Sequence, residues 1–266
     1  MYRILIALCS LIALDAVAIE FIAHRGYSCG TFENTILSVR NAWLVGSDGV
    51  ELDLRVSKDG VVFLYHDDDI DGRSISRLDY AEVNSAMEIT APTFESILNL
   101  GEPPGYFVLD LKEMDPNRYE SLAPLILASA VEQSRFVIQS TSVAVLAAVK
   151  EQLPGAEFYY LTHLKRTFPL YRAPKSNSIV ARIEGFDVDG VSLKGRGFID
   201  QRFIQDFKDA GYLVNVWTIN DPARASYYRD IGVDGLITDF IEQVRSEVLD
   251  GRNFEGQCLD AVQDAS

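Results

Sequence analysis

Basic residues are scarce in this chain of 266 residues, which has 24 lysines and arginines against 39 aspartates and glutamates and a formal net charge of −15. A surface with so much negative charge repels polyanions, so nucleic acid is not expected as a partner. Histidine is rarer still, with three residues. A bound cation would make the potential locally positive, and a single phosphodiester could then be accepted.

Two common motifs are also missing. No GxGxxG loop follows the first expected strand, which argues against an open dinucleotide-binding sheet. No CxxC pair occurs, so a zinc site is not suggested. Cys9 lies in the N-terminal apolar run, and Cys29 and Cys258 remain. The last two either form a disulfide in an oxidising compartment or stay as free thiols, and the sequence leaves both readings open.

No apolar run reaches the length of about 20 residues that a membrane span needs. The apolar run from Ile4 to Leu14 follows Arg3 and ends at Ala16-Val17-Ala18. A positive start, a short apolar core and a small-x-small end are typical of a secretory signal peptide. We therefore expect residues 1–18 to be a signal peptide and the protein to be exported, either periplasmic or secreted. The alternative is a buried first strand or helix.

The rest of the chain has the pattern of one α/β domain, which we place at residues 19–251, followed by a polar tail at 252–266. Helical segments, for example Arg118–Glu132, Ser142–Gln152, Gln201–Ala210 and Pro222–Asp230, separate most of the expected strands. Strands that alternate with helices favour a parallel sheet, and eight of them predict a (β/α)8 TIM barrel. The expected strands are Glu20–Ala23, Val50–Leu54, Phe107–Leu111, Phe136–Gln139, Phe158–Leu161, Val188–Leu193, Leu213–Trp217 and Gly235–Ile237.

One apolar run breaks the alternation. Residues 61–65 follow the second strand after a linker that contains Asp59-Gly60, which is a hairpin turn signal. A link this short has no room for the crossover that a parallel strand requires. We therefore expect a short antiparallel hairpin strand after barrel strand 2. With Asp59-Gly60 as the turn, Lys58 would face Val61 and Asp53 would lie opposite His66.

Acidic side chains share one face of two expected strands. In Glu51-Leu52-Asp53-Leu54 the side chains alternate, so both acids point one way and both leucines the other. In a barrel the leucines would meet the helices and the acids would point into the mouth. Asp110 and Lys112 repeat the pattern. Close carboxylates need a compensating cation, and an all-oxygen site suits Ca²⁺ or Mg²⁺. A solvated acidic edge and a surface ion pair are the simpler alternatives.

Two of the three histidines fall at strand ends near these acids. His24 follows the first expected strand, at the end where barrel enzymes place their active sites. The hairpin would bring His66 back to the acidic pair, with Asp67 as the carboxylate that orients its ring. Such a pair can remove one proton and donate another during phosphodiester cleavage. The third, His163, is expected on the surface or the rim.

These residues, taken in order, resemble the glycerophosphodiester phosphodiesterase family. The resemblance covers roughly residues 20 to 245 and rests on several ordered motifs at compatible spacing. The segments that carry it are His24-Arg25-Gly26, Glu33-Asn34-Thr35, Glu51-Leu52-Asp53, Asp59-Gly60, His66-Asp67, Ala91-Pro92-Thr93-Phe94, Asp110-Leu111-Lys112, Val216-Trp217-Thr218-Ile219-Asn220 and Asp234-Gly235-Leu236-Ile237-Thr238-Asp239.

The resemblance implies a barrel like that of the phosphoinositide-specific phospholipases C and the hydrolysis of glycerophosphodiesters to glycerol 3-phosphate and an alcohol. Attack could come from a neighbouring substrate hydroxyl through a cyclic phosphate or directly from water. It also implies a role for each matching residue. His24 and His66 would be general base and acid, in either order. Glu51, Asp53 and Asp110 would hold one divalent cation, Ca²⁺ or Mg²⁺, and Arg25 and Lys112 would contact the substrate phosphate. Glu33, Asn34 and Asp67 would support these site residues, and Trp217 would line the pocket.

The sequence departs from the family pattern at two places in the expected site. Asp110 stands where the family usually has glutamate, which is one methylene longer, so the cation would shift or a water would bridge the gap. The acids Asp68, Asp69 and Asp71 follow His66-Asp67 in place of the usual threonine-leucine-aspartate-arginine run, in a loop that shapes the pocket rim. Substrate preference could therefore differ, although both histidines are intact.

Two other functions remain open. A lysophospholipase D-like or sphingomyelinase D-like enzyme would use the same chemistry on a lipid, and it would need an apolar mouth, for which Phe94, Tyr106, Phe198 and Trp217 are candidates. These residues serve equally well as core. A binding module with a decayed site is the third reading, and the intact histidine pair argues against it. The motifs do not indicate the oligomeric state.

Overall fold

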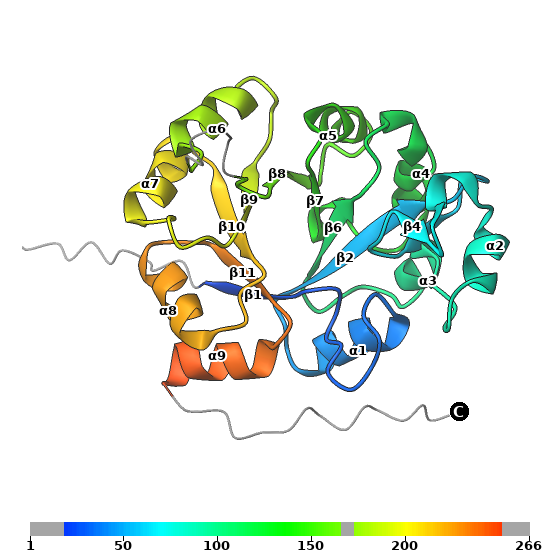
Figure 1. Ribbon diagram of the computed structural model, residues 1–266, viewed down its shortest axis with the longest axis horizontal. Coiled ribbons are helices and arrows are strands. Elements are labelled where there is room, and N and C mark those ends of the chain that lie inside the picture. Colours follow the sequence, from blue (N-terminus) through cyan, green and yellow to red (C-terminus); the bar gives the residue numbers. More distant parts are fainter. Residues whose placement is uncertain (1–18, 166–172, 252–266) are drawn as a thin grey trace, which may run out of the picture.

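Eight parallel strands close into a barrel in the computed structural model, which describes residues 19–165 and 173–251. The first and last barrel strands lie side by side, and pairing between the first two completes the closure (Figure 1). The predicted α/β class and TIM barrel are therefore confirmed. The strands are β1 (Glu20–Ala23), β2 (Gly49–Val56), β6 (Tyr106–Leu111), β7 (Phe136–Ser140), β8 (Glu157–Thr162), β9 (Gly190–Lys194), β10 (Leu213–Trp217) and β11 (Gly235–Thr238).

Helices surround the barrel (Figure 1), and side-chain oxygens from the preceding residue cap several of them. Thr35, Ser142 and Asp200 each accept a hydrogen bond from a backbone N–H in the first helical turn, which satisfies a donor that has no partner within the helix. The helices are α1 (Ile36–Leu44), α2 (Tyr80–Ser85), α3 (Phe94–Leu98), α4 (Leu122–Ala128), α5 (Val143–Lys150), α6 (Ser176–Ile183), α7 (Gln201–Asp209), α8 (Pro222–Asp230) and α9 (Ile241–Asp250).

The single helix predicted over Arg118–Glu132 was wrong. The chain forms a 3-10 turn at Pro116–Tyr119 and then the shorter α4. Pro124 is the third residue of α4, and proline lacks a backbone N–H and is tolerated only in the first turn of a helix. A helix that contains Pro124 must therefore begin shortly before it, as α4 does.

Strand side chains divide into two layers by alternation. Those that face outward, such as Phe21, Leu52 and Leu109, belong to the large core between the barrel and the helices. Ile22 and Val108 belong to a separate small cluster that fills the barrel interior. Since successive side chains on a strand point to opposite faces, the neighbours of Leu52 and Leu109 point inward. The acids of β2 and β6 therefore face the barrel interior, as the alternation predicted.

The antiparallel strand after β2 is present as β3 (Val62–Leu64), but its predicted register was wrong by one residue. Leu54 pairs with Leu64, and the Tyr65 amide donates to the Asp53 carbonyl, so Tyr65 and not His66 lies opposite Asp53. The turn is longer than the two-residue turn assumed from the sequence. Ser57 pairs with Val61 across three loop residues, and the last, Gly60, takes a φ of +84°, as in a three-residue hairpin loop.

After β3 the chain builds a small lobe beside the mouth before it returns to the barrel. Its elements are the two-stranded ribbon of β4 (Asp69–Ile70) and β5 (Arg73–Ser74), a 3-10 turn at Ile75–Arg77, and α2. Phe63, Ile75 and Val83 form a separate apolar cluster there. The lobe therefore packs through its own core and forms one wall near the open end of the barrel.

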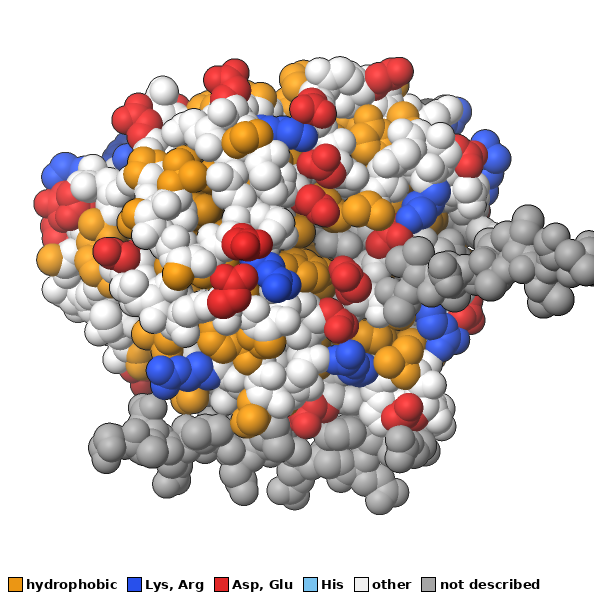
Figure 2. All heavy atoms as spheres, turned by 180° about the vertical axis from the view of Figure 1, so that it is seen from behind, with side chains coloured by type: hydrophobic (Ala, Val, Ile, Leu, Met, Phe, Trp, Pro, Cys, Tyr) orange, Lys and Arg blue, Asp and Glu red, His pale blue; other side chains and the backbone are white. Residues whose placement is uncertain are grey.

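Several expectations lie outside the described residues, namely the signal peptide at 1–18, the tail at 252–266 and any role of Cys258. Cys29 is disulfide-bonded. Within the described ranges, no helix combines the length and apolar character needed to cross a membrane. Acidic side chains are spread over the face shown in Figure 2, with apolar ones between them, in keeping with the net charge of −15.

Gly26 tests how tightly the loop after β1 is packed. It has a φ of +77°, and a Cβ built on it would lie 2.4 Å from Ser38 Oγ and 2.7 Å from the Ser38 backbone carbon. We expect Gly26→Ala to lower the free energy of unfolding by about 2–4 kcal/mol, through backbone strain and the clash with α1. Urea denaturation measures this. Gly30→Ala is the control, because Gly30 has a φ of +75° with open space around it and reports the strain alone; equal losses in both variants would contradict the packing argument.

Candidate active site

A pocket of about 400 Å³, including its open mouth, lies at the carboxyl ends of the barrel strands. It gathers most of the side chains that the sequence singled out, from segments between the first and last strands. Of the proposed apolar mouth residues only Trp217 lines it, because Phe94 is buried on α3 and Tyr106 lies at the opposite end of β6. The lining residues are His24, Arg25, Glu51, Asp53, His66, Asp110, Lys112, Gln139, Leu161, His163, Trp217 and Ile237.

Glu51, Asp53 and Asp110 form one buried acidic cluster. Each offers a carboxylate oxygen, and the three oxygens lie within 4.8 Å of one another. Asp53 and Asp110 are direct neighbours in the β2–β6 register, which sets their spacing. Three carboxylates without nitrogen or sulfur ligands make a hard, all-oxygen set, so these residues fit a divalent cation such as Ca²⁺ or Mg²⁺.

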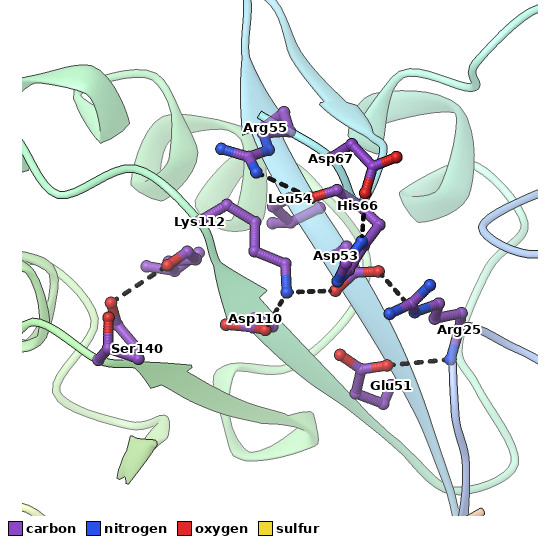
Figure 3. A network of polar contacts seen from close by, with 12 residues as sticks. Arg25, Glu51, Asp53, Leu54, Arg55, His66, Asp67, Asp110, Lys112 and Ser140 are labelled. Atoms are coloured by element: carbon purple, nitrogen blue, oxygen red, sulfur yellow. Dashed lines mark hydrogen bonds and ion pairs between the residues drawn. The ribbon is translucent and has the colours of Figure 1, made fainter. Parts of the chain in front are cut away.

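Two basic side chains hold this cluster together. The Lys112 ammonium lies between Asp110 and Asp53, with its Nζ 2.6 Å from Asp53 Oδ1 and a hydrogen bond to Asp110 as well (Figure 3). On the other side, Arg25 Nε lies 3.1 Å from Asp53 Oδ2, and the Arg25 backbone amide donates to Glu51 Oε2 at 2.9 Å. The sequence predicted Arg25 and Lys112 as phosphate contacts, and the structure places both at the pocket wall.

The residues expected to support the site are also in contact with it. Asn34 Nδ2 donates to Asp53 Oδ2 at 2.8 Å, and the Asp53 amide donates back to Asn34 Oδ1 at 3.1 Å. Asn34 reaches this position with a φ of +54°, a conformation that asparagine tolerates better than most residues. Glu33 pairs with Arg25 at 2.7 Å. Asn34 thus fixes the Asp53 carboxylate, while Glu33 fixes Arg25.

Burial and mutual repulsion give the three acids different proton affinities. Burial, together with the charge of Asp53, raises the pKa of Glu51 to about 8. Burial also raises the pKa of Asp110, although Lys112 opposes it. For Asp53 burial acts in the same direction, but Lys112 and Arg25 outweigh it and lower the pKa. Glu51 is therefore the acid that retains a proton at neutral pH until a cation compensates its charge.

The raised pKa of Glu51 predicts proton release on cation binding. A bound cation requires the carboxylate form, so Ca²⁺ affinity should rise with pH up to about 8, where Glu51 ionises, and level off above it. Calorimetric titration at pH 7 in two buffers of different ionisation enthalpy should reveal the released proton. Glu51→Gln is the control and should abolish this release. Equal heats in both buffers for the unsubstituted protein would contradict the assignment.

His24 is oriented by a carboxylate from the last barrel strand. Its Nδ1 lies 2.6 Å from Asp239 Oδ1, and Asn220 Nδ2 donates to the other Asp239 oxygen at 2.6 Å. Burial lowers the pKa of His24, but Asp239 and the charge of Glu51 outweigh it, so the pKa is raised overall. The same contact, aided by Asn220, lowers the pKa of Asp239 against the effect of burial. The imidazole thus has one nitrogen fixed and its other nitrogen free of this contact.

His66, which also lines the pocket, has the same arrangement. Its Nδ1 lies 2.7 Å from Asp67 Oδ1, which is the partner that the sequence predicted. Arg55 Nη2 donates to the His66 carbonyl at 2.8 Å and fixes the backbone there. The His66 side chain is 41% exposed, whereas that of His24 is 16% exposed. The pocket therefore has one shielded imidazole and one at its rim.

Four residues in or next to this pocket had no role assigned from the sequence. Asp239 was recognised only as part of a motif, although a closed barrel puts the end of β11 beside the end of β1 and hence beside His24. Asn220, which holds Asp239, was likewise recognised only as part of a motif. Gln139 is buried on the inner face of β7 next to Asp110, and its Oε1 accepts no hydrogen bond in the described structure. His163 lines the pocket with its ring edge against Trp217, although we expected it on the surface or the rim.

Curated proteins resemble most of the chain at low identity. A glycerophosphodiester phosphodiesterase of Bacillus subtilis is 24% identical over 82% of this chain and 83% of its own length. Another protein of that name, from Caldanaerobacter subterraneus, is 26% identical over 86% of this chain and 98% of its own length. The match therefore spans most of the Bacillus subtilis relative and nearly all of the Caldanaerobacter subterraneus one.

Solved structures share the fold. A putative glycerophosphoryl diester phosphodiesterase from Silicibacter pomeroyi has a TM-score of 0.74 at 20% identity, over 90% of this chain and 96% of that one. An Oleispira antarctica phosphodiesterase, solved with the product sn-glycerol-3-phosphate, has a TM-score of 0.73 at 24% identity, over 86% of this chain and 96% of that one. The family model described as "Glycerophosphoryl diester phosphodiesterase family" matches residues 24–243. The predicted family and enzyme class are thus confirmed, and the chain belongs to the glycerophosphoryl diester phosphodiesterase family.

Proposed function

We propose that this protein hydrolyses glycerophosphodiesters to glycerol 3-phosphate and an alcohol, with one divalent cation and two histidines. One observation carries the proposal. Two imidazoles, each with Nδ1 held by a carboxylate, open on the same pocket as three buried acids that fit a cation. The product bound to the Oleispira antarctica relative is glycerol 3-phosphate, which supports the choice of substrate class.

The side chains divide the work by position. Arg25 and Lys112 bind the phosphate oxygens, because both reach the pocket from beside the acidic cluster. His24 and His66 carry protons through their free ring nitrogens, one taking a proton from the nucleophile and the other giving one to the leaving oxygen. When bound, the cation supplies charge that offsets the negative charge developing on the phosphate. Asp239 and Asp67 keep the two rings in the required tautomer.

A substrate panel tests the proposed reaction. Purified protein should release glycerol 3-phosphate from glycerophosphocholine, glycerophosphoethanolamine or glycerophosphoglycerol in the presence of Ca²⁺ or Mg²⁺, as measured by a coupled dehydrogenase assay. Bis-p-nitrophenyl phosphate without a glycerol group is the comparison substrate, and it should be cleaved more slowly. Saturable binding of the diesters without any turnover would contradict the proposal and favour a binding module.

An apolar groove supports a second candidate, the lysophospholipase D-like or sphingomyelinase D-like reading. A groove of about 840 Å³, including its open mouth, runs from His66 between the β1–α1 loop and the small lobe. Phe32, at its edge, is 51% exposed. His66 lines both the groove and the pocket, so the groove begins beside the site, and Glu33, Asn34 and Asp67, which support the site, line its near end. Its apolar lining comes from Phe32, Leu64, Tyr65, Ile70, Ala86, Met87, Ile89, Ala91 and Pro92.

Lysophosphatidylcholine, offered as monomers, separates the two candidates when compared with glycerophosphocholine. A lipid-directed enzyme would turn over the acylated substrate faster, and Met87→Glu would lower that rate by at least about tenfold, because it places a charge in the groove. The rate for glycerophosphocholine would stay within about twofold. Preference for the unacylated substrate by the unsubstituted protein would remove this second candidate.

We also propose export of the protein, guided by the N-terminal signal peptide. The charge and hydropathy pattern of residues 1–18 supports it. Fractionation of cells that express the full chain, followed by N-terminal sequencing of the mature product, tests this. A product that begins at Met1 and stays with cytoplasmic markers would refute it.

A further inference from the structure

Two basic residues at the mouth differ from Arg25 and Lys112, because neither Lys194 nor Arg196 has a carboxylate within ion-pair distance in residues 19–165 and 173–251. Unpaired basic side chains are common in the described part of the chain, so what distinguishes Lys194 and Arg196 is their place beside Trp217 and His163, which line the pocket. Arg25 and Lys112 are each neutralised by acids of the site. Lys194 and Arg196 therefore carry the positive charge that remains for a ligand.

Lys194 is positioned on the inner wall of the barrel mouth. It ends β9 beside Trp217 of β10, and its Nζ lies 5.1 Å from the centroid of the Trp217 ring. The ring of His163 meets the same indole, with the centroids 5.1 Å apart. Arg196 Nη2 donates to the His163 carbonyl at 3.4 Å. Trp217 and His163 both line the pocket, so Lys194 and Arg196 lie next to its β8–β10 wall.

The electrostatics of His163 agree with this arrangement. Its pKa is lowered, first by burial and then by the charges of Lys194, Lys165, Lys112 and Arg196. The Trp217 ring does not neutralise Lys194, because a cation–π contact at a partly exposed site is a weak attraction. A charge-assisted hydrogen bond to an anion is stronger, so an incoming anion can compete for the ammonium.

We propose that Lys194 and Arg196 form a subsite for an anionic group, a carboxylate or a phosphate, carried by one alcohol of the diester. This deepens the proposed function and rests on it. The acids of β2 and β6 lie on one side of the barrel, and β9 lies across the mouth from them in the strand order. A diester bound by Arg25 and Lys112 would extend one alcohol along Trp217 toward Lys194. The subsite selects acidic glycerophosphodiesters over those with neutral or zwitterionic head groups.

Two pairs of substrates test the subsite. Glycerophosphoserine differs from glycerophosphoethanolamine by one carboxylate, and glycerophosphoinositol 4-phosphate differs from glycerophosphoinositol by one phosphate. We expect higher kcat/KM for the acidic member of at least one pair, and a loss of that preference at high salt. Lys194→Gln should lower kcat/KM for the preferred acidic substrate by about tenfold, as expected for one charge-assisted hydrogen bond, and leave its partner within about twofold. Arg182→Gln, which removes an exposed base in the last turn of α6, at the end of the barrel opposite the mouth, is the control for net charge.

Equal effects of Lys194→Gln on both members of each pair, or no effect on either, would overturn the subsite. A binding readout keeps this result separate from failure of the proposed function. Quenching of tryptophan fluorescence by the same ligands, measured in chelator, reports binding without turnover. Preferential binding of the acidic ligand, lost in Lys194→Gln, would support the subsite even in a protein that hydrolyses none of the diesters, whereas hydrolysis without any such preference would refute it.

Discussion

Replacement of either His24 or His66 by alanine is expected to lower kcat for glycerophosphodiester hydrolysis by about 10²–10⁴-fold, the contribution typical of one positioned proton carrier. Both rings line the pocket, and both have Nδ1 fixed by a carboxylate. The two histidines act as a unit, one removing a proton from the nucleophile and the other donating a proton to the leaving oxygen. The double variant should therefore be little slower than the slower single variant. Initial rates with glycerophosphocholine at saturating cation measure all three.

His163→Ala is the matched control, because it removes an imidazole from the same pocket. The pKa of His163 is lowered by burial and by nearby cations, and no carboxylate fixes its ring in the described structure, so it lacks the features of a proton carrier. We expect a loss of less than tenfold. Activity that survives His24→Ala and His66→Ala, or a His163→Ala variant as slow as either, would refute the two-histidine assignment.

Removal of divalent cations by a chelator is expected to abolish turnover, and added Ca²⁺ or Mg²⁺ should restore it. The expectation rests on the buried cluster of Glu51, Asp53 and Asp110, whose oxygens lie within 4.8 Å of one another. Asp53→Asn or Asp110→Asn should raise the cation concentration needed for half-maximal activity by at least about tenfold, because each removes one of three charged ligands. Titration of activity with each ion after exhaustive chelation gives these values.

Asp69→Asn is the control for the loss of a negative charge near the mouth. Asp69 lies on β4 in the small lobe, is exposed, and does not line the pocket. The Asp69→Asn variant should need the same cation concentration for half-maximal activity as the unsubstituted protein. Turnover that persists in chelator, or an unchanged cation requirement in Asp53→Asn, would remove the cation from the proposal and leave only the histidines. Circular dichroism of each variant separates a lost ligand from a lost fold.

The barrel and the inward direction of its acids could be predicted because alternation along a strand is a local property. Leu52 and Leu54 are buried against the helices, as their alternation with Glu51 and Asp53 along the strand implied. The exact pairing of residues in the β2–β3 hairpin could not be predicted, because it depends on the length of the loop. Gly60 is the second loop residue in a two-residue turn and the third in a three-residue loop. Asp-Gly is compatible with both, and backbone pairing of Ser57 with Val61 decided it.

Partners that come from distant strands were harder to predict. Asp67 follows His66 directly, so its role was readable from the sequence, whereas Asp239 lies 215 residues from His24 and meets it only through barrel closure. The apolar groove next to His66 was missed for a similar reason. Its walls come from the β1–α1 loop and from the lobe after β3, and nothing in either segment alone indicates that the two face each other.

The pairing of β1 with β11 has a consequence for how the enzyme matures. His24 is among the first residues of the barrel to leave the ribosome, and Asp239 is among the last. The ring at the start of the chain therefore stays without its orienting carboxylate until the final strand, β11, docks beside β1, its neighbour in Figure 1. A nascent chain would keep this imidazole misaligned until then, and truncations that end before Asp239 should do the same even when the earlier strands have assembled.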